Sequence, residues 1–77
     1  MDNKMVDIML HIDEEIDSQE REILRDTLLH TDGVMAADTH DTRPHLLIIE
    51  YNPDVIGSSE FIHIAQRSGL HAQLIGM

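Results

Sequence analysis

The chain has no cysteine, few aromatic residues and few basic residues, and each shortage excludes a class of function. Without cysteine it can form no disulfide and offers no thiolate, the ligand that selects Cu(I) and helps to hold zinc. Its two aromatic residues are Tyr51 and Phe61, so the core must consist of Leu, Ile, Val and Met. A chain this short buries only about 60–65% of the surface that its unfolded form exposes. Self-association would therefore add useful stability.

Positive charge is also scarce. Fifteen Asp and Glu oppose five Lys and Arg, giving a formal net charge of −10 with histidines neutral. That field repels nucleic acid and anionic lipid. The first ten residues have neither the basic segment nor the long apolar segment of a secretory signal, and no apolar run approaches the ~18–20 residues that span a bilayer. We expect a cytoplasmic protein with no nucleic-acid partner and no membrane insertion.

The first half of the chain predicts a strand followed by a helix. Residues 5–12 alternate between an apolar face and a mixed one, which is the period of a strand. Asp17 with Glu20 three residues later resembles a capping box and predicts a helix over 18–30, which ends before Gly33. Four apolar side chains fall on one stripe of this helix: Ile23, Leu24, Leu28 and Leu29.

The second half predicts a hairpin, a helix and a last strand. Residues 34–40 form a weak strand and 45–51 a strong one, with the hairpin loop between them ending at Pro44. A second helix begins at Ser58 or Ser59 and turns Phe61, Ile62 and Ala65 inward. Gly69 ends this helix in a left-handed conformation, and 71–77 form the fourth strand.

Strand, helix, hairpin, helix and strand in one domain over 1–77 predict the α+β class with a ferredoxin-like βαββαβ fold. Right-handed crossovers place the antiparallel strands in the order 4-1-3-2 and both helices on one face. The other face of the sheet is expected to stay bare.

Three short segments of turn and packing residues are spread over nearly the whole chain: DGV at 32–34, YNPD within 48–56 and SGLHA at 68–72. In these segments the chain resembles the heavy-metal-associated domains. The resemblance implies the fold. In that family two cysteines on the first loop hold the metal; the family's spacing, counted back from Gly33, puts those cysteines onto Asp17 and Glu20 and the preceding methionine onto Glu15. None of the soft ligands is present, and Leu70 replaces an aromatic residue.

Histidine is the unusually abundant residue, with six in 77. Four of them are expected at one end of the antiparallel sheet, and imidazole suits Zn, Cu(II), Ni and Co: His11, His40, His45 and His71. His11 and His71 share the open face and form the favoured pair, whereas alternation with Leu47 turns His45 to the helix side. Solvated histidines at strand ends are the simpler alternative. The acids of the first loop lack the glycine of a calcium loop, and helix capping explains them.

The strand at 45–51 is apolar on both faces, which is typical of a strand covered on both sides. The bare face is therefore expected to carry an apolar patch that associates with another protein surface, most simply a second copy: Met5, Met9, Leu46, Ile48 and Ile75. Scattered surface aliphatic residues are the alternative explanation.

No nucleophile elbow, phosphate loop or HExxH motif is present, and the serines lie at turns and helix ends. We therefore expect no enzymatic activity. The sequence favours a small cytoplasmic binding or adaptor module that acts through its open sheet face, with a homodimer as its expected state. The alternative is a metal-binding or metal-delivery protein that uses histidines, and a sensor of a small ligand is a third hypothesis resting on fold analogy.

Overall fold

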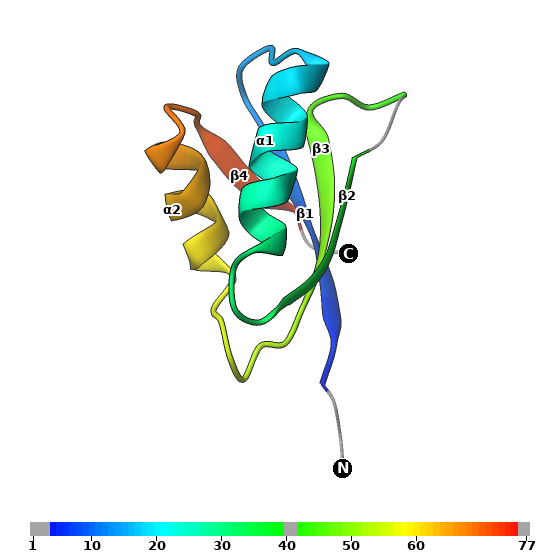
Figure 1. Cartoon of the computed structure of the whole chain (residues 1–77), viewed down its shortest axis with the longest axis vertical. Coiled ribbons are helices and arrows are strands. Elements are labelled where there is room, and N and C mark those ends of the chain that lie inside the picture. The colour runs from blue at the N-terminus through cyan, green and yellow to red at the C-terminus, as the bar shows by residue number, and fades with distance from the viewer. Residues whose placement is uncertain (1–3, 40–41, 76–77) are drawn as a thin grey trace.

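A computed structural model describes residues 4–39 and 42–75, which form one four-stranded sheet and two helices (Figure 1). The elements follow one another in the order β1 (Val6–Ile12), α1 (Ser18–Leu29), β2 (Val34–Thr39), β3 (Leu46–Tyr51), α2 (Ser59–Arg67) and β4 (Ala72–Ile75). All neighbouring strands are antiparallel, in the order β2-β3-β1-β4. The predicted βαββαβ fold and strand order are confirmed.

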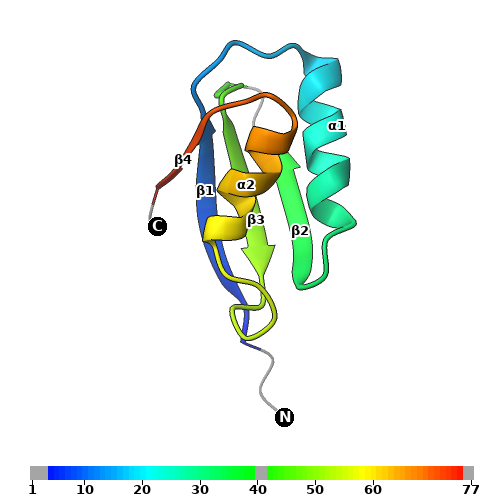
Figure 2. The ribbon, with the colours of Figure 1, turned by 90° about the vertical axis from the view of Figure 1, so that its left-hand side faces the viewer.

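Both helices lie on one side of the sheet, and the other side carries no helix (Figure 2). The core lies between the two layers because every second residue of the central strands points to the helices. The largest fully buried side chains lie there: Phe61, Leu10, Ile12, Leu24, Leu28, Leu47 and Ile49. Phe61 meets Tyr51 edge to face, with ring centroids 5.0 Å apart. The two aromatic residues thus anchor a core that is otherwise aliphatic.

The predicted helix start and stops are partly confirmed. The Glu20 backbone N–H donates to Asp17 Oδ1 at 2.8 Å, as the capping pattern predicts. Gly69 has φ +79, the left-handed conformation expected after α2. Ser58 is the cap residue of α2, which begins at Ser59 as predicted, although the Ser58 side chain makes no cap hydrogen bond.

Two helix faces differ from the predicted stripes. Ile23 is 57% exposed, whereas its neighbours on the predicted stripe, Leu24 and Leu28, are buried. In α2, Phe61 and Ala65 are buried as predicted and Ile64 is buried with them, whereas Ile62 is only half-buried. A two-layer domain covers each helix with a single sheet, so only the centre of a broad apolar stripe is buried.

No helix within 4–39 and 42–75 is both long enough and apolar enough to cross a bilayer.

Candidate functional site

Two features of the sheet are candidate sites. One is the face away from the helices, called the open face below. The other is the end of the sheet where β1 stops and β3 and β4 start, called the histidine end because three histidines lie there: His11, His45 and His71.

The open face has an apolar row that crosses β4, β1 and β3 and ends at Asp38 of β2. Cross-strand pairing aligns Ile75 with Met9, Met9 with Ile48, and Ile48 with Asp38. Opposed aliphatic side chains pack together across strands, so Ile75, Met9 and Ile48 form a continuous surface. Ile75 is 39% exposed although it is a large apolar residue. Met5 is 36% exposed and lies just before β1. The predicted patch residues thus lie on the side of the sheet that no helix covers.

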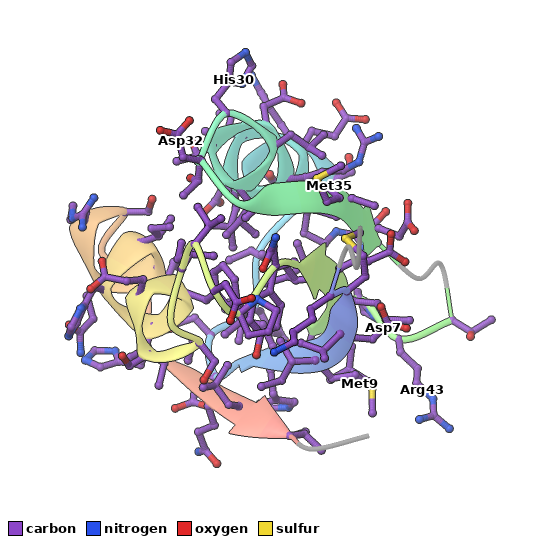
Figure 3. All side chains as sticks on the ribbon, turned by 90° about the horizontal axis from the view of Figure 1, so that it is seen from below. Asp7, Met9, His30, Asp32, Met35 and Arg43 are labelled. Carbon is purple, nitrogen blue, oxygen red and sulfur yellow. The ribbon has the colours of Figure 1, made fainter. Side chains whose placement is uncertain are left out.

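A hollow adjoins the apolar row on the side of the histidine end. Its volume is about 340 Å³, and its lining combines the predicted patch residues with two residues of the loop before β3: Met9, Leu46, Ile48, Thr42 and Arg43. In Figure 3 the side chains of Met9 and Arg43 point away from the two helices. Arg43 was not predicted as a site residue, because the sequence of a hairpin loop does not indicate where its side chains point.

The opposite end of the open face is acidic. Asp7 of β1 pairs with Glu50 of β3, so two carboxylates lie directly across from each other. Neither carboxylate takes part in an ion pair with any described residue, and the Arg43 guanidinium is likewise without one. The open face therefore carries an apolar centre with an unpaired cation toward one end and an unpaired acidic pair at the other.

At the histidine end, the structure brings His11 and His45 together. Their ring centroids are 5.9 Å apart, with ring planes inclined by 27°. Alternation along the strand would separate them, but His45 precedes β3 and lies in the turn closed by the hydrogen bond from Leu46 N–H to the Arg43 carbonyl. Outside the strand, side-chain alternation no longer fixes the direction of the ring.

The Nδ1 atoms of these rings lie beside oxygen atoms. His45 Nδ1 lies 3.1 Å from the carbonyl oxygens of both Ile12 and Glu14. Because carbonyls only accept, this Nδ1 carries the proton and donates, which leaves Nε2 of the neutral ring with its lone pair. His11 Nδ1 lies 3.4 Å from Asp13 Oδ1, within ion-pair distance when the ring is protonated.

His71 has a different partner, the carboxylate of Glu14. Its backbone N–H donates to Glu14 Oε1 at 2.8 Å, and its Nδ1 lies 2.5 Å from Glu14 Oε2. The backbone hydrogen bond and then the ring hydrogen bond lower the pKa of the Glu14 carboxyl below 4.5. The same carboxylate raises the pKa of the His71 imidazole above 6.5, mainly through the hydrogen bond. This clasp joins the first loop to the start of β4 across 57 residues of sequence.

Three of the four predicted histidines are thus distributed over two contacts. His11 stands with His45, His71 stands with Glu14, and His40 lies outside the described residues. No group of three or more His, Asp or Glu side chains in 4–39 and 42–75 is arranged to hold a metal ion. A site with fewer protein ligands stays a prediction.

The first loop, which precedes α1, does not fit a soft metal. The positions that correspond to the family's cysteines are Asp17 and Glu20, and Asp17 is already occupied in capping the Glu20 backbone N–H. Carboxylate oxygens are hard ligands and do not select Cu(I).

Comparison with known proteins yields structural matches only. No protein-family model matches the chain, and no curated protein matches it. Among solved structures, it is similar to a protein from Bacillus anthracis str. Ames described as copper-ion-binding, with a TM-score of 0.82 at 11% identity over 94% of this chain and 100% of the other. It is also similar to a copper-binding domain of the P-type ATPase HMA7, with a TM-score of 0.81 at 11% identity over 91% and 93% of the two chains.

A third similar structure is the copper form of a single-site variant of CopA from Bacillus subtilis, with a TM-score of 0.76 at 15% identity over 94% of this chain and 93% of that one. Structural similarity at identities this low establishes the fold and does not show what the chain binds. The predicted resemblance is confirmed at that level: the chain has the fold of the heavy-metal-associated, copper-binding domains, without the cysteines of their metal site.

Proposed function

We propose that the protein is a small non-enzymatic binding module that acts through its open face, and that it forms a homodimer there. The observation that supports this proposal most strongly is the apolar row of Ile75, Met9 and Ile48 on the side of the sheet that carries no helix. An apolar surface rimmed by charged residues usually marks a site of association. The missing thiolates remove the soft-metal role that the fold would otherwise suggest.

The size of the open face limits the area that a dimer can bury. Four strands spaced ~4.8 Å apart, each with roughly six residues at ~3.4 Å per residue, give a face of roughly 400 Å². Two such faces bury less than the ~1,600 Å² of a standard interface. We therefore expect a weak, transient dimer that forms and separates readily.

Replacing Ile48 with Lys tests the proposal. A lysine in place of Ile48 would put a charge within the apolar row and bury it in the contact, which should yield a folded monomer. The control is Ile23→Lys, the same substitution at a residue that is 57% exposed on α1. Sedimentation equilibrium at physiological ionic strength should show a dimer for the wild type and the control, and a monomer for Ile48→Lys. A wild type that is monomeric at millimolar concentration would remove the homodimer.

A second candidate function is binding of a borderline metal ion at the histidine end. Its support is the arrangement of His45 and His71, whose Nδ1 atoms are engaged by oxygens, as in histidines that bind metal through Nε2. Suitable ions are Zn(II), Ni(II), Co(II) and Cu(II). Because no three ligands gather among the described residues, the site would hold the ion with a histidine pair and water, and binding would be weak.

Native mass spectrometry with each of these ions tests the second candidate. Changing His11 and His71 together to Ala should abolish binding, and His45→Ala should weaken it, since His45 is the ring beside His11. The double variant of His30 and His63 to Ala is the control, because these residues lie at the end of α1 and on α2. Unchanged binding by the His11/His71 variant would exclude this site.

A further inference from the structure

The charges of the open face determine how two copies can pack. Arg43 borders the hollow toward the histidine end, while Asp7 and Glu50 lie at the other end of the same face. In Figure 3 the side chains of Asp7, Met9 and Arg43 all lie on the side of the sheet away from the helices. The guanidinium and the two carboxylates make no ion pair within the described part of the chain.

The acidic pair is unfavourable in a single copy. Like charges directly opposite each other on neighbouring strands destabilise a sheet. The third carboxylate of the face, Asp38, ends the apolar row beside Ile48, so the described part of this region offers no compensating base. A local conflict of this kind is expected where a surface serves a function.

Two symmetric ways of packing these faces can be compared. When two sheets pack face to face, their strands stay within about 30° of a common line, so the strands of the two copies run either in the same or in opposite directions. In the first arrangement Arg43 meets Arg43 and the acidic pairs meet each other. In the second, Arg43 of each copy meets Asp7 and Glu50 of the other. Juxtaposed like charges disfavour the first arrangement, whereas in the second only Asp38, an exposed residue of the edge strand β2, faces its own counterpart.

From this complementarity we infer that the occupant of the open face is a second copy of the chain, packed with its strands in the opposite direction so that Arg43 faces Asp7 and Glu50 of the other copy. The inference rests on the proposed function and specifies its interface. The apolar row lies at the centre, close to the two-fold axis, where Met9 and Ile48 meet their counterparts. Met5, beyond Asp7 on the same face, then lies toward the hollow beside Arg43 of the second copy, and methionine adapts well to such a space.

Charge reversal distinguishes this arrangement from its alternatives. Arg43→Glu places three acids together at each end of the dimer and should weaken dimerisation roughly tenfold. The double variant Asp7→Lys with Glu50→Lys places two lysines against Arg43 and should weaken it to a similar extent. The triple variant that combines all three changes re-forms opposite pairs only when the strands run in opposite directions. Its dissociation constant should return to within about threefold of the wild type.

Two control variants separate interface effects from changes in net charge. Arg67→Glu makes the same charge change as Arg43→Glu on α2, and Glu22→Lys with Asp32→Lys matches the acidic double variant at exposed positions of α1 and the loop after it. Sedimentation equilibrium is run at physiological ionic strength, because the net charge of −10 on each copy opposes association at low salt. Circular dichroism establishes that each variant is folded.

The outcomes separate the inference from the function on which it rests. Weakening by Arg43→Glu and recovery in the triple variant, with unchanged controls, support the inference. A wild-type dimer that Arg43→Glu does not weaken, or a triple variant that stays weak, overturns the arrangement and leaves a homodimer. A wild type that is monomeric at millimolar concentration overturns both, and assigns the open face to a different occupant.

Discussion

Asp7 and Glu50 lie directly opposite each other on β1 and β3, and no described residue neutralises either carboxylate through an ion pair. Repulsion between the two carboxylates lowers the stability of the monomer. The same carboxylates can form ion pairs with a basic surface of a partner. In this chain, stability of the monomer and association are therefore expected to oppose each other.

Asp7→Asn tests that opposition. Removing one charge should raise the free energy of unfolding of the monomer by about 0.2–1 kcal/mol, since it relieves a cross-strand repulsion. The same change should weaken the dimer, because Arg43 loses a partner. Chemical denaturation in the monomeric Ile48→Lys background gives the first quantity, and sedimentation of the otherwise wild-type chain gives the second. Asp32→Asn is the exposed control, and a loss of monomer stability in Asp7→Asn would contradict the repulsion.

The clasp between Glu14 and His71 predicts how stability depends on pH. The lowered pKa of Glu14 adds stability that is present above 4.5 and lost as pH falls through the lowered value. The raised pKa of His71 adds stability that is present below 6.5 and lost as pH rises through the raised value. Both contributions are complete only between these two limits, so the clasp stabilises the protein most at about pH 5–6.

Glu14→Gln isolates the clasp. The His71 pKa, measured by NMR titration of its ring, should fall toward its ordinary value, and the stability advantage near pH 5–6 should shrink. Glu15→Gln is the control, because Glu15 is an exposed neighbour on the same loop. A His71 pKa that is the same in the wild type and in Glu14→Gln would contradict the hydrogen bond.

Gly33 and Gly69 both have positive φ, but only one of them is crowded. A Cβ on Gly33 would lie 2.8 Å from Ile56 Cγ2 and 2.9 Å from Val55 Cγ1, whereas a Cβ on Gly69 would meet nothing within 4 Å. Gly69→Ala should cost about 1 kcal/mol of backbone strain. Gly33→Ala should cost roughly 2–4 kcal/mol, because overpacking adds to the strain. Equal losses in thermal or chemical denaturation would contradict the close packing of the 52–57 loop against Gly33.

The protein should not bind Cu(I) with the affinity of a dithiolate site. Asp17 and Glu20 offer hard oxygens, and Asp17 is engaged in capping α1. Competition against a Cu(I) chelator measures this directly. A variant that carries cysteine at both positions is the positive control, since it restores the ligand type of the family. Tight binding by the cysteine-free chain would show that another set of ligands handles copper.

The elements were predictable because alternation, caps and glycines are local signals. The residues of β1 that point to the helices, Leu10 and Ile12 among them, follow from its period of two. The bulge in β2, where the register shifts between Val34 and Ala36, carried no such signal. The position of a bulge depends on how two strands pair, and the sequence pattern of one strand does not show that pairing.

The candidate site was less predictable because it depends on contacts between distant segments. The contact of His45 with His11 arises in a turn, where alternation fails. Glu14 and His71 meet only after β1 and β4 pair, so no local periodicity marks them. The apolar open face was predictable from the residues of β3, which are apolar on both sides. The positions of the charged residues around it follow only from the register of the strands.

Isotope-filtered NMR on an equal mixture of labelled and unlabelled chains tests most directly whether a second copy covers the open face. Nuclear Overhauser contacts between copies should involve the methyl groups of the apolar row, Met9, Ile48 and Ile75, and should vanish in Ile48→Lys. Because the strands run in opposite directions, Met5 of one copy should also contact Arg43 of the other. Absence of contacts between copies at millimolar concentration, or contacts confined to exposed residues elsewhere such as Ile23 and Val55, would contradict the proposed dimer.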